Sequence, residues 1–248
     1  MRPIEMMELK EAVKQMAKDT APGPDGFTTN FFHVGWEWLK EELLIIVEDS
    51  RRTGDILRAF NATFLTLIPK ETGTEDPGKF QPIALCNVLY KVISKVISNR
   101  LKPLLPLIIS PEQAGFLEGR QILNGIILVH EAIHTLKTDK SLGMLLKLDL
   151  SKAYDKVNWT FLAGILRSFG FGEEWIKWIT NLVSSAFFSV LTNGSPTAPF
   201  PVSRGIRQGD PLSPFLFIII AEGLGIMLKA MQEEHKISGL QICEGVQA

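Results

Sequence analysis

The chain has 248 residues, of which 46% are hydrophobic, and its formal net charge is −1 at pH 7. This length and apolar content supply a packed core in one large or two smaller domains, which excludes intrinsic disorder. Cys86 and Cys243 lie far apart in the sequence and form no CxxC or His-linked set, so we expect no disulfide framework and a reducing compartment. The neutral charge counts mildly against nucleic-acid binding but leaves room for a locally basic cleft.

The N-terminal part of the chain predicts helices, one turn and one strand. Apolar positions recur at helical spacing over residues 4–18, and because this segment is also charged it is no signal peptide. Two prolines end the helix in APGPDGF, residues 21–27, where Asp-Gly favours a turn. A long helix is expected over about 29–52, with Gly54 as its C′ residue. Residues 62–70 alternate and are rich in Thr, Phe and Ile, which predicts a strand.

The middle of the chain predicts two helices, at about 87–101 and 121–137, followed by a strand at 144–150. The strand alternates so that one face carries leucines and the other ends in the carboxylate of Asp149. Ser151 is suited to cap a helix that begins directly afterwards. A carboxylate at a strand end can face an open cleft, although such residues are also common as turn formers or helix caps.

The C-terminal part predicts a helix at 173–184, a hairpin and a final apolar helix at 212–233. Two alternating strands, 186–192 and 197–203, flank Asn-Gly at positions 193–194, which is a strong hairpin signal. The apolar run of the last helix contains an acidic residue and falls short of the roughly 18 to 20 apolar residues that span a bilayer. We therefore expect a buried core helix and no membrane association. Helices and strands mix without regular βα repeats, so the fold class is α+β.

Six sequence blocks occur in order along nearly the whole chain. They are PGPDGF (22–27), LIPK (67–70), FQPIALCNVLYKVISKVISNRL (80–101), SPEQAGFLEGRQ (110–121), KLDLSKAYDKVNW (147–159) and RGIRQGDPLSPFLF (204–217). This series resembles the reverse transcriptase domain of non-LTR (LINE-type) retrotransposons, in the form common in plant genomes. The resemblance implies a right-hand polymerase, with a fingers-like region at 1–142 and an incomplete palm at 143–248 whose antiparallel sheet packs on helices.

The resemblance also implies an activity, RNA-directed DNA polymerisation by a two-metal mechanism, with an RNA template, a DNA primer and dNTP as partners. Two Mg²⁺ ions roughly 3.5 to 4 Å apart drive such nucleotidyl transfer, and they prefer carboxylate oxygens. Asp149 resembles the first catalytic metal ligand, and the backbone carbonyl of Leu150 is a further expected ligand. Asp155 and Asp210 are interpreted as structural, as a helix N-terminal charge and a turn cap. A nuclear location is implied by the family alone.

Four positions resemble the family's nucleotide-binding residues. Tyr154 resembles the aromatic gate that excludes the ribose 2′-hydroxyl, and Gln208 and Gly209 resemble the loop beneath the incoming nucleotide and template base. Lys70 resembles a fingers residue near the triphosphate. Each position also has an ordinary structural interpretation: core packing for the tyrosine, a turn before a helix for the Gln-Gly pair, and a solvated strand end for the lysine.

Basic residues supply the expected contacts to the nucleic acid. Lys91 and Lys95 on the predicted helix at 87–101, together with Arg120, are the positions we expect to bind it. From charge alone, the cluster on that helix is more simply interpreted as a solvated face. Arg204 and Arg207 form a second local cluster in the last sequence block.

The chain departs from the family pattern in two places. Gln81 stands where the family usually has an arginine that grips the triphosphate, and a neutral amide is expected to bind it more weakly. The aromatic-Ala-Asp-Asp block that supplies the second carboxylate does not appear by Ala248. We therefore expect a truncated domain with negligible polymerisation by this chain alone. A remnant that only binds nucleic acid is the alternative.

A motif of a different class occurs at residues 130–134, where His-Glu-Ala-Ile-His matches HExxH on a predicted helix. This spacing would place His130 and His134 on one face, with Glu131 as a general base, as in zinc metalloproteases. The metzincin extension is absent, because lysines occupy positions 137 and 140. A zinc hydrolase is therefore a minor alternative.

Overall fold

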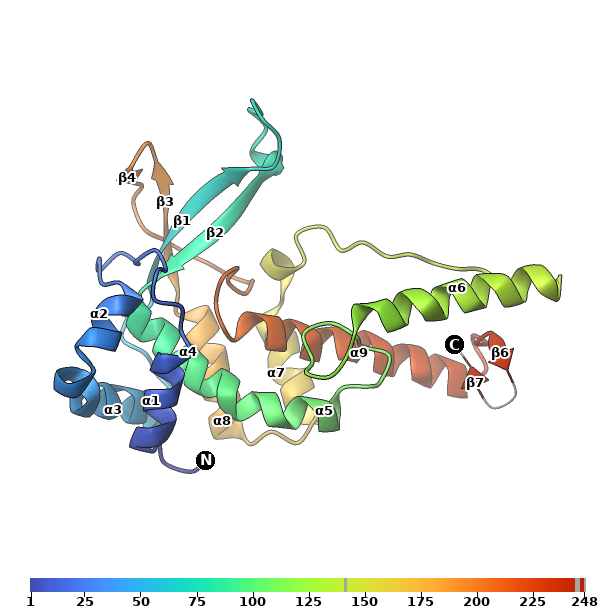
Figure 1. The fold of residues 1–248 in the computed structure, drawn as a ribbon, viewed down its shortest axis with the longest axis horizontal. Helices are drawn as coiled ribbons and strands as arrows, with labels where there is room; N and C mark the ends of the chain where they lie inside the picture. The colour runs from blue at the N-terminus through green and yellow to red at the C-terminus, as the bar shows by residue number, and fades with distance from the viewer. Residues whose placement is uncertain (141, 244–245, 248) are drawn as a thin grey trace.

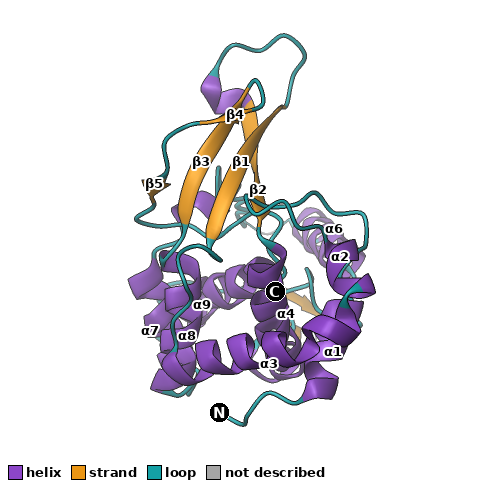
Figure 2. Cartoon of the chain, turned by 90° about the vertical axis from the view of Figure 1, so that its left-hand side faces the viewer, coloured by secondary structure: helices purple, strands orange, loops and turns teal. Residues whose placement is uncertain are grey.

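The computed structural model describes residues 1–140, 142–243 and 246–247, and there a small sheet projects from a body of helices (Figure 1, Figure 2). The α-helices are α1 (Met6–Lys14), α2 (Thr29–Val34), α3 (Trp36–Thr53), α4 (Val88–Leu101), α5 (Leu105–Ile108), α6 (Ile122–Thr138), α7 (Trp159–Ser168), α8 (Glu173–Ser184) and α9 (Ser213–Glu233). Short 3-10 helices lie at Pro77–Lys79, Lys102–Leu104 and Tyr154–Lys156. The mixture confirms the α+β class.

The sheet combines strands from two distant parts of the chain. Its strands are β1 (Ala62–Pro69), β2 (Phe80–Cys86), β3 (Phe187–Thr192), β4 (Ser195–Pro196) and β5 (Phe200–Pro201). The order is β2-β1-β3-β4, with β5 also paired to β3. Because β1 is antiparallel to β2 but parallel to β3, the sheet is mixed and the expected antiparallel sheet is wrong. A hairpin loop forces antiparallel pairing only between strands that it joins, and helices separate β1 from β3. A separate pair is formed by β6 (Gln241–Cys243) and β7 (Val246–Gln247).

Helix α4 forms the centre of the hydrophobic core. Its side chains Val92, Ile93, Val96 and Ile97 have no exposed surface. Helices α1 and α3 pack against α4, and α7 packs against both α8 and α9. Since β2 leads into α4 through Asn87, the base of the sheet is fixed to the most deeply buried helix.

The predicted helices are largely present, with changes at their ends. The first is shorter than expected, and the long helix predicted at 29–52 is divided at Gly35 into α2 and α3. Gly54 ends α3 with a left-handed φ of 73°, which confirms its C′ position. Asn193 and Gly194 have φ values of 50° and 79°, the positive values that a type I′ hairpin turn requires. Strand β2 was not predicted.

The strand expected at 144–150 does not form. Residues 142–150 have no regular secondary structure and run as an extended chain after α6 (Figure 1). The leucines of the expected inner face are 72%, 62% and 61% exposed, for Leu146, Leu148 and Leu150. A strand needs a neighbour for its backbone hydrogen bonds, and among the described strands none pairs with this segment. Alternation alone therefore did not produce a strand here.

The helix expected directly after Ser151 is also absent. Residues 151–153 form a turn in which Lys152 has a φ of 52°, and the next α-helix, α7, begins only at Trp159. Asn158 caps that helix, because its side-chain oxygen accepts a hydrogen bond of 2.9 Å from the amide of Phe161.

Helix α9 divides into two halves with different surroundings. Leu216, Ile218 and Ile219 are completely buried, which confirms a core helix for the first half. In the second half Leu224 and Met227 are 45% and 60% exposed. With 21 residues, α9 is long and apolar enough to meet the length and composition criteria for a membrane span, which corrects the expectation that its apolar run is too short.

Candidate nucleotide site

The loop that precedes α9 is fixed to the segment that precedes α7 by backbone hydrogen bonds. The amide of Gly205 donates to the carbonyl of Val157 at 2.7 Å, and the amide of Ile206 donates to the carbonyl of Tyr154 at 2.9 Å. The indole Nε1 of Trp159 donates to the carbonyl of Gly205 at 2.7 Å. These hydrogen bonds therefore join two of the sequence blocks, 147–159 and 204–217.

The same loop is fixed to the sheet through Gln208. Its carbonyl accepts a hydrogen bond of 3.2 Å from the amide of Ala84, and its side-chain Oε1 accepts one of 3.1 Å from Nε2 of Gln81. Gly209 follows with a φ of 97°, a left-handed conformation that L side chains rarely adopt. The Gln-Gly pair is thus a constrained turn held against β2.

Two adjoining cavities lie where these segments meet. The first, of about 350 Å³, is called the Tyr154 cavity, and Lys70, Gln81, Lys152, Tyr154 and Gln208 are among the residues that line it. The second, of about 580 Å³, shares Gln81, Tyr154 and Gln208 with the first and adds Gly209. The four residues predicted to bind nucleotide are therefore brought together at the walls of these two cavities, although their role in binding stays a prediction.

Tyr154 is positioned by a stacked ring contact. Its ring lies 5.1 Å from that of Phe217 on α9, with an interplanar angle of 18°. Partial burial raises the pKa of the Tyr154 phenol above its ordinary value, so the hydroxyl stays protonated at neutral pH. The side chain both packs on α9 and lines the Tyr154 cavity, so the two interpretations of this position are compatible.

The predicted metal site lacks a set of ligands. Asp149 is exposed, in the extended segment after α6, and the side chain of the following Leu150 is 61% exposed. Within the described part of the chain there is no group of three or more His, Cys, Asp or Glu residues that could hold a metal ion. The residues present therefore do not fit a two-metal centre, although Asp149 stays the predicted first ligand.

Asp210 has the structural role expected for it. Its carboxyl group is buried, and it accepts hydrogen bonds from Ser94 Oγ on α4 and from Ser213 Oγ, at 3.1 Å, in the first turn of α9. Burial raises the pKa of Asp210, against the opposing effects of the Ser94 hydrogen bond and the positive charge of Arg207. Asp155 lies in the first turn of a short 3-10 helix rather than at the start of an α-helix.

The basic residues expected to bind nucleic acid lie in unlike environments. Lys91 and Lys95 are half-buried on α4, and burial, followed by the charge of Lys102, lowers the pKa of Lys95. The guanidinium of Arg120 donates to the backbone carbonyls of Ile109 and Gln113 at 3.1 Å and 2.8 Å, and also to that of Ser110. Arg120 thus holds a loop together, and binding of nucleic acid by these three residues stays a prediction.

The HExxH motif lies on α6, as predicted, with exposed His130 and Glu131. His134 Nε2 lies 3.4 Å from Thr138 Oγ1 one turn later. Since the described residues hold no group of three potential metal ligands, the structure offers no support for a zinc hydrolase.

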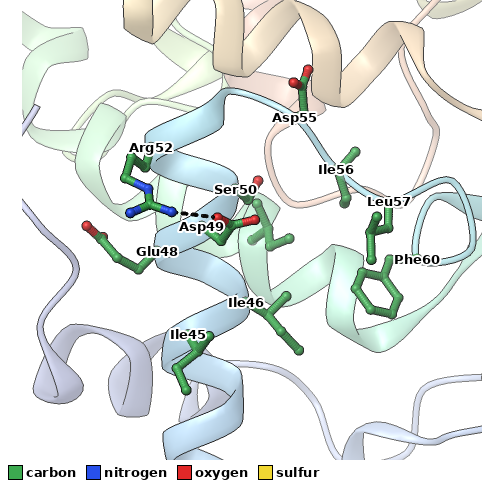
Figure 3. A pocket seen from close by; sticks show the side chains of 11 residues that line it. Ile45, Ile46, Glu48, Asp49, Ser50, Arg52, Asp55, Ile56, Leu57 and Phe60 are labelled. Atoms are coloured by element: carbon green, nitrogen blue, oxygen red, sulfur yellow. Dashed lines mark hydrogen bonds and ion pairs between the residues drawn. The ribbon is translucent and has the colours of Figure 1, made fainter.

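Another cavity, of about 410 Å³, lies between α3 and the loop that follows it (Figure 3). Its wall is largely apolar, and the charged groups at its edge already have partners, as in the 3.2 Å ion pair of Arg52 with Asp49. None of the residues predicted to carry chemistry lines this cavity, so its chemistry gives no reason to place the functional site there.

The sequence did not predict three of the side chains that organise the site. Lys152 lines the Tyr154 cavity, and Asn87 connects two loops by accepting from the amide of Asp25 at 3.1 Å and donating to the carbonyl of Ala59 at 2.9 Å. Asn61 accepts a hydrogen bond from the buried guanidinium of Arg207. Lysine and asparagine are common loop residues, and only the positions of Lys152 and Asn87 inside sequence blocks could have drawn attention to them.

Comparison with known proteins identifies the family. A family model described as reverse transcriptase (RNA-dependent DNA polymerase) matches residues 68–241. The chain belongs to this family. A 149 kDa protein of transposon TX1 from Xenopus laevis is 32% identical over 92% of this chain. A Pol polyprotein of retrotransposable element R2 from Popillia japonica is 28% identical over 96% of it, and that of R2DM from Drosophila melanogaster is 26% identical over 85%.

The chain is a reverse transcriptase domain related to those of non-LTR retrotransposons. The chain spans 18%, 32% and 19% of the lengths of the three relatives. The family implies a divalent metal, a nucleic-acid template and primer, and dNTP as partners.

Proposed function

We propose that this chain forms the dNTP-binding part of an RNA-directed DNA polymerase, in the plant form of the LINE-type elements. In this proposal Lys70 contacts the triphosphate and Tyr154 excludes the ribose 2′-hydroxyl. Gln208 and Gly209 lie beneath the incoming nucleotide and its template base.

One observation carries the proposal: Lys70, Tyr154 and Gln208 come from three distant segments and line a single cavity. The cavity combines two lysines, Lys70 and Lys152, and one carboxylate, Asp155, with amide groups and two aromatic rings. Cationic groups attract phosphate oxygens, amides offer hydrogen bonds to a base, and a ring limits the shape of the sugar. This combination fits a nucleoside triphosphate.

Nucleotide binding is tested with a fluorescent derivative, mant-dATP, and with unlabelled dATP as competitor. We expect Lys70→Met to weaken binding because it removes a cation from the cavity. Lys10→Met, the same change at an exposed residue of α1, is the matched control. The proposal fails if the wild-type chain does not bind mant-dATP, or if both substitutions weaken it equally.

We infer further that the chain alone does not extend a primer. Asp149 supplies one carboxylate, whereas two Mg²⁺ ions require several anionic ligands. Primer extension on an RNA template is therefore expected at background level for the wild-type chain and for Asp149→Asn. Extension above background that Asp149→Asn abolishes would show that the inference is wrong and that Asp149 is the metal ligand.

A second function, nucleic-acid binding without catalysis, is supported by partly exposed lysines on α4. Lys91 and Lys95 retain exposed surface, and within the described residues neither forms an ion pair. We expect RNA binding that weakens steeply with salt, because phosphate contacts release counterions. Binding that is undetectable or independent of salt would contradict this function.

We also propose, from the family alone, that the working polymerase has a nuclear location.

A further inference from the structure

Arg207 is a positive charge in the interior of the protein, one residue before Gln208. Arg207 is only 6% exposed. The two arginines of the expected basic cluster, Arg204 and Arg207, therefore do not both face solvent. The guanidinium lies over the ring of Tyr90 on α4, 3.9 Å from the ring centroid, and 5.7 Å from the ring centroid of Phe188 on β3. Arg207 therefore contacts two elements of the fold, α4 and β3.

Polar contacts add two further elements. The Arg207 Nη2 group donates to Oδ1 of Asn61, the residue before β1, and Nη1 lies 3.9 Å from Sγ of Cys86, at the end of β2. Asn61 is itself fixed, because its Nδ2 donates to the carbonyl of Leu182 at 3.1 Å and to Ser185 Oγ at 2.7 Å. One side chain of the loop is thus held by α4, β2, β3 and the residue that precedes β1.

Burial of the Arg207 guanidinium is energetically unfavourable if the side chain only fills space in the core. Within the described residues Arg207 forms no ion pair with a carboxylate, and its buried Nε has no hydrogen-bond partner. Removing a charged group from water without full pairing is unfavourable, and a methionine or leucine would fill the same volume without that penalty. The planar guanidinium, however, can stack on Tyr90 and reach Asn61 at the same time, which fixes its direction.

Asp210 provides a second buried anchor on the other side of the Gln-Gly pair. Ser94 Oγ and Ser213 Oγ both donate to its carboxyl group, and Ser94 Oγ also accepts from the amide of Leu212 at 3.3 Å. Gln208 and Gly209 are therefore the two residues between a buried cation and a buried carboxyl group. Each anchor is tied to α4, the centre of the core.

We propose that Arg207 is a positioning residue. It holds the Gln208–Gly209 turn against the Tyr154 cavity and the second cavity beside it, so that a nucleotide meets a preformed surface. This inference rests on the proposed nucleotide-binding function. Arg207 does not line the Tyr154 cavity, so it acts through Gln208, whose carbonyl and side chain receive hydrogen bonds from Ala84 and Gln81.

The test compares Arg207→Met, which removes the charge, with Arg207→Lys, which keeps the charge but loses the planar fork. We expect both variants to bind mant-dATP roughly 2- to 30-fold more weakly, the range of couplings transmitted by residues that do not touch the ligand. Amide hydrogen exchange at Ala84 should accelerate in both, because its acceptor is the carbonyl of Gln208. If the charge alone mattered, Arg207→Lys would behave like the wild type, which would overturn the proposed role of the fork.

Trp178→Phe is the matched control for general loss of stability. It removes a buried hydrogen bond of 2.9 Å to Ser50 Oγ, between α8 and α3, and Trp178 lines neither cavity. We expect this variant to unfold more easily while its nucleotide affinity and its exchange at Ala84 stay unchanged. Equal effects of Trp178→Phe and Arg207→Met on both readouts would overturn the inference.

The two readouts separate this inference from the function on which it rests. If the wild-type chain fails to bind mant-dATP, the proposed function is wrong, and exchange at Ala84 alone decides whether Arg207 holds the turn. If the wild type binds and the Arg207 variants bind equally well, the inference is wrong and the function stands. Should Arg207→Met not fold, Tyr90→Leu removes the ring beneath the guanidinium and is expected to give the same two effects.

Discussion

Gln81 offers the sharpest prediction, because the resemblance places an arginine at this position of the Tyr154 cavity. Its side chain is exposed and donates to Gln208 Oε1 at 3.1 Å. The substitution Gln81→Arg removes this neutral hydrogen bond and introduces a planar cation beside Lys70 and Lys152. We expect it to tighten the binding of dATP, since the triphosphate then meets a third positive charge.

The size of the expected gain in affinity follows from one hydrogen bond that is lost and one that is gained. Losing the bond between the amides costs about 0.5–1.5 kcal/mol, whereas hydrogen bonds to a charged group contribute about 1.5–3 kcal/mol. Because the site is open to solvent, we take the lower end of both ranges, about 1.5 and about 0.5 kcal/mol, which leaves a net gain of about 1 kcal/mol. That gain corresponds to roughly fivefold tighter binding.

The assay is a competition titration of mant-dATP with dATP at constant ionic strength. Gln15→Arg, the same change at an exposed residue at the end of α1, controls for the added charge. The gain should be smaller for deoxyadenosine, which has no phosphates. Unchanged affinity in Gln81→Arg, in a chain whose wild type binds dATP, would refute the assignment of this side of the cavity to the triphosphate.

The remaining predictions concern stability. Glu8→Gln should lower the free energy of unfolding at pH 7 by about 1.5–3 kcal/mol, because Arg100 donates to both carboxylate oxygens of Glu8, at 2.6 Å and 2.9 Å. Burial opposes ionisation of Glu8, but the hydrogen bond and charge of Arg100 outweigh it and lower the pKa below the usual 4.5. The wild-type advantage should therefore be present above pH 4.5 and disappear as the pH falls through the lowered pKa; urea titrations that show the same advantage at pH 2 and pH 7 would contradict this. Gly205→Ala should destabilise the fold by about 1–3 kcal/mol, because Gly205 has a φ of 100° and an added Cβ would lie 3.2 Å from the carbonyl oxygen of Asp155. Gly172→Ala, where an added Cβ meets open space, should change the melting temperature little, and equal shifts in the two variants would disprove the strain argument.

Much of the fold was predictable because local signals and tertiary packing agree. The helix at α4 has apolar residues at a spacing that buries one whole face, and the Asn-Gly pair at 193–194 allows the positive φ values of a tight hairpin. The motif blocks at 147–159 and 204–217 also indicated residues of the Tyr154 cavity, since Tyr154 and Gln208 line it. The domain boundary near 142 stays a prediction.

Where local signal and tertiary context disagree, the sequence interpretation was wrong. The alternating leucines before Asp149 favour a strand, but a strand forms only beside another strand, and pairing is not encoded in the segment itself. The same holds for the direction of β1 relative to β3, which depends on how the intervening helices return the chain to the sheet.

The sequence by itself determined the family, the helices and the residue types available at the site, because these depend on motifs and on periodicity within short segments. Only the tertiary structure decided that Arg207 is buried over Tyr90 while Asp149 is exposed. Charge on a loop residue indicates solvent by default, and burial of a cation depends on partners supplied by distant elements, here Asn61 and Tyr90. Contacts of this kind exist only after the core has brought those elements together.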